Sequence, residues 1–254
     1  MTETGQTTAV GEVALIVGGG PGISASCARL FSREGLAVAV AARKPDKSVL
    51  RDLKAETGAA LHGCDAADPT SVAALFTQVA GDLGTPSLVV HNIDGRVPDI
   101  FRKKITEADP ALALQTIKNG AYSAFLVAQQ AAAQMLAQPL NDAGHRGSII
   151  FTNASAATKG YANSGAFAMA CQAKAGLAQS LARELMPQGI HVAHVVIDGI
   201  IDTPRVRAEF GLTEDEPALA PEAIASSYWS LIQQDPSAWS FEIDVRPAGE
   251  AFFE

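Results

Sequence analysis

Four glycines in five residues follow the first apolar run of the chain. The run Val13 to Val17 leads directly into Gly18-Gly19-Gly20-Pro21-Gly22, and a helix-like stretch follows. The backbone amides of such a turn converge with a helix N-terminus, and their partial positive charge suits a pyrophosphate. The alternative is a tight strand-to-helix turn that binds nothing. Because the turn lies between a predicted strand and a predicted helix, we favour phosphate binding.

The elements that must position this turn alternate between short β-branched runs and longer stretches rich in Ala and Leu. We predict strands at residues 13–17, 38–40, 59–64, 87–91, 148–152, 190–197 and 240–245. We predict helices at residues 23–33, 69–83, 110–138, 164–186 and 221–234. Strands that alternate with helices form parallel sheets with crossover connections. The pattern therefore predicts one α/β domain, a doubly wound parallel sheet with helices on both faces.

Two segments fall outside this alternation. The stretch from Asp202 to Pro221 is irregular and acidic, and we expect residues 203–221 to form a lid over a site. Residues 1–11 are polar and are predicted to be a flexible N-terminal segment, which leaves 12–254 as a single dinucleotide-binding domain.

The chain resembles the short-chain dehydrogenase/reductase family from end to end. The family's T-G-x-x-x-G-x-G turn is matched by Gly18 and Gly22, with Val17 in place of Thr and Ser24 in place of the third Gly. Serine is small enough to keep the helix close to the strand. The resemblance implies a Rossmann-type fold and a nicotinamide dinucleotide cofactor.

Three further family motifs are kept in part. The Asp that contacts adenine after the third strand is matched by Asp65, and the N-N-A-G motif after the fourth strand is kept only at Asn92. The P-G-x-x-x-T motif after the sixth strand is kept at Gly199 and Thr203, with Asp198 in place of Pro. These positions surround the expected dinucleotide.

The end of the second strand selects between the two nicotinamide cofactors. An acidic residue there would accept the ribose hydroxyls of NAD and repel a 2′-phosphate, whereas this chain has Arg43 and Lys44. We therefore expect NADP(H), with NAD(H) as the alternative if both are solvated surface cations. The expected cofactor-binding residues are Gly18, Gly20, Gly22, Ile23, Arg43, Lys44, Asp65, Asn92, Gly199 and Thr203.

The catalytic positions that the resemblance implies are replaced. The family uses a Ser, and a Tyr and Lys at i and i+4 of one helix, so that the ammonium lowers the pKa of the phenol. In this chain these positions hold Ala154, Phe167 and Cys171, and the family's Asn on the long helix falls at or beside Gly120. The usual proton relay is therefore absent.

Several side chains are candidates to replace that relay. Lys174 lies two helical turns beyond Phe167, too far for an easy substitution. Ser155 and Tyr161 follow the predicted strand, although a Tyr in a loop is more often a packing residue. Asp198 borders the expected nicotinamide pocket, but we favour a capping role for it. Cys171 is interpreted as a small buried residue more readily than as a reactive thiol.

Composition excludes several classes of function. The chain has 254 residues, of which 48% are hydrophobic and 18% charged, and its net charge of −8 argues against nucleic acid as a partner. Three scattered cysteines argue against a disulfide framework or a zinc site, so no metal is expected. No apolar run spans a bilayer and the N-terminus lacks a signal pattern, so we expect a cytoplasmic protein without membrane contact.

Three functions stay open. The first is an NADP(H)-dependent oxidoreductase that acts on an unidentified small molecule with nonstandard or weak catalysis. The second is a catalytically silent dinucleotide-binding sensor or partner subunit. The third is a lyase or isomerase that uses Cys171 or Asp198 without redox chemistry. We also expect a homo-oligomer, a dimer or tetramer, built on the two long helices, because the Ala-rich stretch 124–137 would permit close helix approach.

Overall fold

Seven parallel strands form one sheet in the computed structural model, which describes residues 12–100, 102–213 and 216–249. The strand order is β3-β2-β1-β4-β5-β6-β7. The strands are β1 (Val13–Val17), β2 (Ala37–Ala42), β3 (Ala60–Gly63), β4 (Leu88–His91), β5 (Gly147–Ala154), β6 (Ile190–Ile197) and β7 (Glu242–Val245). The predicted α/β fold with a doubly wound parallel sheet is confirmed.

The strand order reverses between β1 and β4. The chain first builds outward from β1 through β2 to β3, then returns to pair β4 with the other edge of β1. In open α/β sheets, a crevice forms at the carboxyl ends of the two strands where the order reverses. The turn after Val17 and the loop after His91 therefore lie side by side, and the Asn92 amide donates to the Val17 carbonyl at 2.8 Å.

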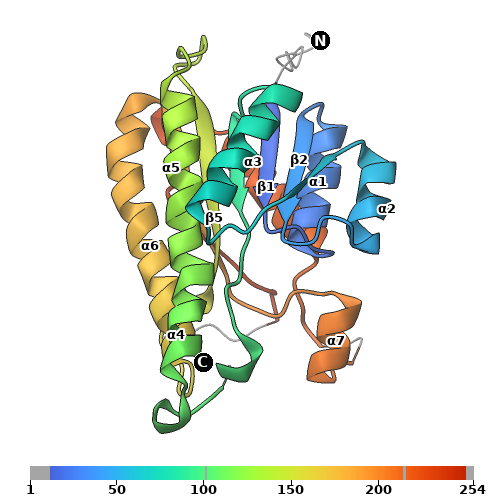
Figure 1. Cartoon of the computed structure of the whole chain (residues 1–254), viewed down its shortest axis with the longest axis vertical. Coiled ribbons are helices and arrows are strands. Elements are labelled where there is room, and N and C mark those ends of the chain that lie inside the picture. Colours follow the sequence, from blue (N-terminus) through green and yellow to red (C-terminus); the bar gives the residue numbers. More distant parts are fainter. Residues whose placement is uncertain (1–11, 101, 214–215, 250–254) are drawn as a thin grey trace.

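Helices cover both faces of the sheet, as Figure 1 shows. The face covered by α1 (Ile23–Arg33), α2 (Ser48–Thr57) and α8 (Pro221–Ile232) buries one apolar cluster. The face covered by α3 (Pro69–Asp82), α5 (Ser123–Leu136) and α6 (Gly165–Leu185) buries a second. Strands buried on both faces need continuous apolar runs, which β1 and β2 have. None of the helices in the described residues has the length and hydrophobicity to cross a membrane.

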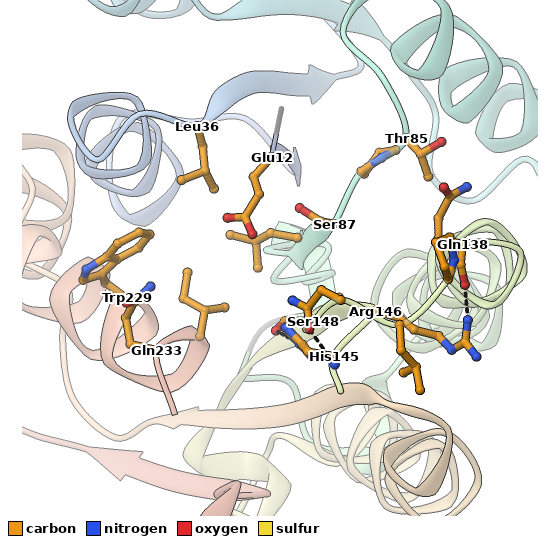
Figure 2. Close-up of a pocket in the computed structure, with 17 residues that line it drawn as sticks. Glu12, Leu36, Thr85, Ser87, Gln138, His145, Arg146, Ser148, Trp229 and Gln233 are labelled. Carbon is orange, nitrogen blue, oxygen red and sulfur yellow. Dashed lines mark hydrogen bonds between the residues drawn. The ribbon is translucent and has the colours of Figure 1, made fainter. Parts of the chain in front are cut away.

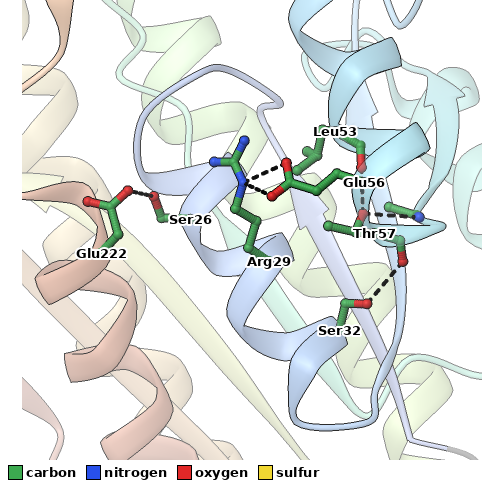
Figure 3. A network of polar contacts seen from close by, with 8 residues as sticks. Ser26, Arg29, Ser32, Leu53, Glu56, Thr57 and Glu222 are labelled. Atoms are coloured by element: carbon green, nitrogen blue, oxygen red, sulfur yellow. Dashed lines mark hydrogen bonds and ion pairs between the residues drawn. The ribbon is translucent and has the colours of Figure 1, made fainter.

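Polar contacts fix α1, which carries the glycine turn at its N-terminus, to its two helical neighbours (Figure 3). On one side the Ser26 hydroxyl donates to the Glu222 carboxylate of α8 at 3.0 Å. On the other side Arg29 Nε donates to both carboxylate oxygens of Glu56 on α2 at 2.9 Å, and the Ser32 hydroxyl donates to the Thr57 carbonyl at 3.0 Å. The start of α1 is thereby held at the carboxyl edge of the sheet.

Two helices were not predicted from the sequence. In α2 only Leu50 and Leu53 are buried, so its apolar stripe is too short to be distinguished from a loop. The short helix α7 (Pro204–Phe210) lies in the stretch that we predicted to be irregular, and none of its residues is buried. Its N-terminus is capped by Thr203, whose hydroxyl accepts from the Val206 amide at 3.3 Å.

The predicted helix over residues 110–138 is three helical segments in succession. They are α4 (Pro110–Ile117), a π-helical turn at Lys118–Tyr122 and α5. The N-terminal segment 1–11 and residues 214–215 of the predicted lid lie outside the described residues.

Candidate functional site

The glycine turn after β1 is closed on one side and open on the other. Gly18 has a φ of 111°, and a Cβ there would lie 2.2 Å from the Asn92 carbonyl oxygen, so only glycine fits. A Cβ on Gly20 would meet no described heavy atom within 4 Å. The backbone at Gly20 is therefore accessible to a phosphate group, as the sequence predicts.

Ser24 braces this turn, a role that the sequence analysis missed. Its hydroxyl donates to the Gly18 carbonyl at 2.8 Å and accepts from the Asn92 side-chain amide at 2.7 Å. Ser24 is almost fully buried. Besides being small, Ser24 connects the turn after β1 to the loop after β4 through its hydroxyl.

The first turn of α1 has no side-chain cap. Its N-cap residue is Gly22, whereas the N-terminus of α3 is capped by the Asp68 carboxylate, which accepts from two backbone amides. A Cβ on Gly22 would lie 3.4 Å from the Thr203 Cγ2 atom, so the start of α7 lies beside the glycine turn. Ile23 is buried beneath this turn. The amides at the start of α1 are free to bind an anion.

The end of β2 lies beside the same turn. The amides of Gly18 and Gly19 both donate to the Ala41 carbonyl at 2.9 Å. Arg43 and Lys44 follow immediately and are exposed. Two cations therefore flank the turn on the side away from β4, where the ribose of a dinucleotide would lie.

Asp65 follows β3 at the same edge. The Cys64 amide donates to the Ala42 carbonyl at 3.0 Å, which holds the start of this loop against the end of β2. Asp65 is exposed, and its Oδ1 accepts from the Ala67 amide at 3.0 Å. The residues at the ends of β1, β2 and β3 together fit the phosphates and adenosine of a dinucleotide.

The three residues that we expect at the catalytic positions come together as an apolar cluster. Ala154 and Phe167 pack against a group of buried residues that includes Cys171. Burial raises the pKa of the Cys171 thiol to about 11, so the thiol is neutral at pH 7. None of the three side chains supplies a proton or a cation.

An ion pair covers the ring at the expected Tyr position. The Arg96 guanidinium lies 5.0 Å from the centroid of the Phe167 ring, and Arg96 Nε donates to the Asp94 carboxylate at 2.6 Å. Both charged residues come from the loop after β4. A phenol at this position would share the space with Arg96.

The loop after β4 also fills the space expected for the family's Asn. Gly95 has a φ of 81°, and a Cβ there would lie 2.7 Å from the Gly120 Cα. A Cβ on Gly120 would in turn lie 3.3 Å from the Ala170 Cβ. The neighbouring Asn119 donates its side-chain amide to the Gly95 carbonyl at 3.4 Å and accepts from Gln115. Asn119 therefore holds the loop.

Lys174 is buried below the site. Its Nζ donates to the Ile93 carbonyl at 2.9 Å and to the Thr152 carbonyl at 3.1 Å, and only 2% of the residue is exposed. Burial lowers its pKa to about 8. The ammonium joins the ends of β4 and β5 and does not reach outward as a replacement for a catalytic lysine.

A buried polar chain fixes the end of β5 from behind. The Asn153 side-chain amide donates to the Cys171 carbonyl and to His194 Nε2, both at 2.9 Å. Because Nε2 accepts, the proton of the neutral ring lies on Nδ1, which donates to the Glu242 carboxylate at 2.8 Å. This chain sets the direction of the backbone at Ala154.

The remaining polar candidates form a second cluster at the same edge. The Tyr161 hydroxyl donates to the Ser155 hydroxyl at 3.0 Å. The Asp198 carboxylate, for which we favoured a capping role, instead pairs with Lys159 Nζ at 3.6 Å and Arg246 Nη2 at 3.1 Å. The sequence analysis named neither cation. Both follow parallel strands, β5 and β7, and this placement was the available signal.

The two ends of the predicted lid segment are joined by backbone contacts. Leu219 forms a bridge with Ile201, and the Leu219 amide donates to the Ile200 carbonyl at 2.7 Å. Gly199 and Thr203 lie between the carboxyl end of β6 and the start of α7. In Figure 1, α7 projects beyond the edge of the sheet that carries the site. The closing movement of a lid stays a prediction.

A separate pocket of about 350 Å³ lies at the opposite, amino edge of the sheet (Figure 2). Its walls include Glu12, Ser87 and Ser148, which lie at the starts of β1, β4 and β5, and Trp229 of α8. The length of a five-residue strand, roughly 16 Å, separates this pocket from the glycine turn. It is therefore not part of the site.

Comparisons with known proteins agree with this geometry. A family model described as enoyl-(acyl carrier protein) reductase matches residues 18–225. The 3-oxoacyl-(acyl-carrier-protein) reductase MabA of Mycobacterium avium is 30% identical over 237 residues, which cover 93% of this chain and 84% of that protein.

Solved structures give the same assignment. A short-chain dehydrogenase from Rhodopseudomonas palustris is 30% identical, with a TM-score of 0.75 over 93% of this chain and 99% of that one. A metagenomic short-chain oxidoreductase in complex with NADP is 26% identical, with a TM-score of 0.76 over 94% and 98% of the two chains. The sheet order, the glycine turn and these relatives agree. The chain belongs to the short-chain dehydrogenase/reductase family.

Proposed function

We propose that this protein is an NADP(H)-dependent oxidoreductase that exchanges a hydride with a small carbonyl, alcohol or activated double bond, and that its catalysis is slow. The observation that carries the proposal is the glycine turn, which is open at Gly20 and flanked by Arg43 and Lys44. The complex of a 26% identical relative with NADP supports the same cofactor.

The preference for NADP(H) rests on the charge at the end of β2. Arg43 presents a planar fork of donors that matches a 2′-phosphate, and Lys44 adds a second positive charge. An acidic residue that accepts the ribose hydroxyls would favour NAD(H), but residues 41–44 contain none.

The weak catalysis follows from the apolar cluster at Ala154, Phe167 and Cys171. Bound NADPH would supply the hydride, but reduction of a ketone also requires a proton on the developing alkoxide. A positioned general acid contributes about 10²- to 10⁴-fold to the rate. The loss of an oxyanion donor costs about 10²- to 10³-fold, and the two factors overlap because the groups act together.

Cofactor binding and turnover are tested in one series. NADPH binding is measured by the change in its fluorescence, and NADPH consumption is followed with a 1,2-diketone, an aryl aldehyde and a short β-ketoester. We expect a dissociation constant in the micromolar range and slow turnover of at least one probe. Failure to bind either NADPH or NADH would overturn the proposal.

The second candidate is a silent dinucleotide-binding sensor or partner subunit. It is favoured by the Arg96–Asp94 pair over Phe167, because this pair occupies the space beside the expected reaction centre. Tight NADPH binding without consumption of any probe would select it. A lyase or isomerase is the weaker alternative, since the Cys171 thiol is neutral and the Asp198 carboxylate is held by two cations.

We further propose a homo-oligomer that uses the outer surface of α4, α5 and α6. The Ala-rich stretch 124–137, on which we based this expectation from the sequence, does not provide the contact surface. Its residues Ala124, Ala128 and Ala131 are buried against the sheet. The exposed surface of these helices carries larger apolar side chains, namely Leu114, Phe125, Leu136 and Met169. Light scattering at micromolar concentration tests this, and a particle of only 26.3 kDa would contradict it.

A further inference from the structure

A tight turn after β5 places three polar side chains together. The amide of Lys159 and that of Thr158 both donate to the Ser155 carbonyl at 3.0 Å, so the chain folds back on itself directly after Ala154. Tyr161 follows two residues later. The turn therefore brings a hydroxyl, a phenol and an ammonium to the carboxyl edge of the sheet, one residue beyond the expected catalytic Ser position.

The hydrogen bonds of this group have a direction. The Tyr161 hydroxyl donates to the Ser155 hydroxyl at 3.0 Å, which leaves the proton of Ser155 free for another acceptor. Lys159 Nζ lies 5.6 Å from the centroid of the Tyr161 ring. A hydrogen bond with the Tyr161 side chain is the main reason why the pKa of Lys159 is raised, and the charge of Asp198 adds to the effect.

Asp198 and Arg246 fix the ammonium from the inner side. The Asp198 carboxylate lies 3.6 Å from Lys159 Nζ and 3.1 Å from Arg246 Nη2, and its side chain is only 10% exposed. The side chain of Lys159 is 30% exposed. One end of the group is therefore anchored in the protein, while the other can exchange protons with water.

We propose that Ser155, Tyr161 and Lys159 form a proton relay that replaces the missing set at Ala154, Phe167 and Cys171. The inference rests on the proposed oxidoreductase function and names the groups that deliver its proton. Ser155 contacts the substrate oxygen, Tyr161 and Lys159 act behind it, and Asp198 is a positioning residue.

The proton transfers balance the hydride transfer. Bound NADPH would supply a hydride to the substrate's carbonyl carbon, and the π electron pair would move onto the carbonyl oxygen. That oxygen takes the Ser155 proton, Ser155 takes the proton of Tyr161, and the Tyr161 oxygen takes a proton from the Lys159 ammonium. Water then protonates Lys159, so each turnover consumes one hydride and one solvent proton. Alcohol oxidation runs the same transfers in reverse.

The two lysines near the site differ in the way that the relay requires. Lys174 is fully buried and its Nζ is bonded to two backbone carbonyls, so it has no route to solvent or to a hydroxyl. Lys159 is partly exposed and lies beside a phenol. Of these two lysines, Lys159 is the one that can donate a proton to the Tyr161 oxygen and recover a proton from water.

The decisive variant is Tyr161→Phe, with Tyr122→Phe as the matched control on an exposed tyrosine of the π-helical turn. For the diketone and aldehyde probes we expect Tyr161→Phe to lower kcat about 10²-fold or more, with the NADPH dissociation constant unchanged within twofold. Imidazolium in the buffer should restore part of the lost rate, because a free acid can replace a missing donor. The control should keep its rate.

Lys159 and Ser155 give independent measurements of the same relay. Lys159→Met should lower kcat, whereas Lys159→Arg should keep most of it because the charge is retained. Ser155→Ala should match Tyr161→Phe and covers the case in which the tyrosine variant fails to fold. Unchanged kcat in folded Tyr161→Phe or Ser155→Ala protein would overturn the relay, as would wild-type protein that binds NADPH and reduces no probe. Failure to bind any dinucleotide would instead remove the proposed function itself.

Discussion

The half of the molecule built on β1, β2 and β3 and the half built on β4 to β7 have diverged to different degrees. The first half keeps its glycine turn, with Gly18 packed against Asn92 and Gly20 open. The second half keeps the backbone path, and the residues that we expect at the family's catalytic positions, Ala154, Phe167 and Cys171, pack as an apolar cluster. A site made of backbone amides depends on the fold, whereas a site made of side chains can be lost without changing the fold.

Packing around these positions in the second half is close. The loop after β4 approaches the π-helical turn and α6 so closely that Gly95 touches Gly120, and its Arg96 lies over Phe167. Space that a polar relay would occupy is filled by backbone and by an ion pair. On the proposed function, we therefore expect that conventional reductase chemistry in this half requires more than three substitutions.

The largest expected effect is a gain of activity that would remove the difference between the halves. Ala154→Ser, Phe167→Tyr and Cys171→Lys together with Lys174→Gln should raise kcat for ketone reduction by about 10²-fold or more. Lys174 must change because the pKa of Cys171 is already affected by its charge, and two buried ammonium groups would repel each other.

The matched control is the triple variant that keeps Lys174, which should gain less. Addition of Tyr161→Phe to the quadruple variant should then have little effect, because the proton would no longer pass through Ser155. Folded quadruple protein that binds NADPH without any gain in kcat would show that the replaced residues are not what limits turnover.

The next effect tests the backbone site of the first half. Gly18→Ala should lower the free energy of unfolding by about 3 kcal/mol, because the φ of 111° and the contact with the Asn92 carbonyl both exclude a Cβ. Gly20→Ala should leave stability unchanged but weaken NADPH binding. Urea denaturation and NADPH titration separate the two. Equal stability losses in both variants would contradict the assigned difference between the closed and open sides of the turn.

Cofactor preference gives a smaller effect in the same half. Arg43→Ala should weaken NADPH binding about 10- to 100-fold and leave NADH binding unchanged, because a charge-assisted hydrogen bond contributes about 1.5–3 kcal/mol. Arg51→Ala, an exposed arginine of α2, is the control. Native protein that binds NADH at least as tightly as NADPH would show that our interpretation of β2 is wrong.

The pH dependence of stability should arise mainly in the catalytic half. Burial lowers the pKa of His91, His145, His191 and His194, which all lie on or beside β4, β5 and β6. The unfolded chain, with His pKa values near 6.5, then binds more protons than the folded chain below that pH. The free energy of unfolding should therefore fall as the pH drops from about 7 to 5.

Hydrogen exchange at pH 7.5 and 5.5 localises this effect. Protection of the β6 amides should fall more than that of the β1 amides, and His194→Gln should reduce the difference. An equal loss of amide protection in both halves would show that these four histidines do not cause the pH dependence.

The smallest expected effect is on the surface of the first half. Glu56→Gln removes the ion pair with Arg29. The side chains of Arg29 and Glu56 are 42% and 52% exposed, so the substitution should lower the free energy of unfolding by less than about 1 kcal/mol. If urea denaturation shows that the free energy of unfolding falls by more than about 2 kcal/mol, the contact between α1 and α2 stabilises the first half more than an exposed ion pair should.

Prediction from the sequence succeeded where the pattern itself carries the physics. Alternation of short apolar runs with longer helix-like stretches located all seven strands, and the signal is clearest at β1, which is buried along its whole length and continuously apolar. It missed α2 and α7, because α2 buries only Leu50 and Leu53 and α7 buries no residue. Among site residues, Ser155, Tyr161 and Asp198 were named as candidates, but their shared connection to Lys159 was not.

The sequence by itself determined the fold class and the position of the glycine turn, because these depend on residue type and on spacing along the chain. The loss of the usual catalytic side chains stays a prediction. Only the tertiary structure decided which polar groups meet. The Ser24 brace joins residues 68 positions apart, and the Lys159–Asp198 pair joins β5 to β6. Such contacts arise because parallel strands bring distant carboxyl ends to one edge of the sheet, and the residue pattern contains no record of the distances between them.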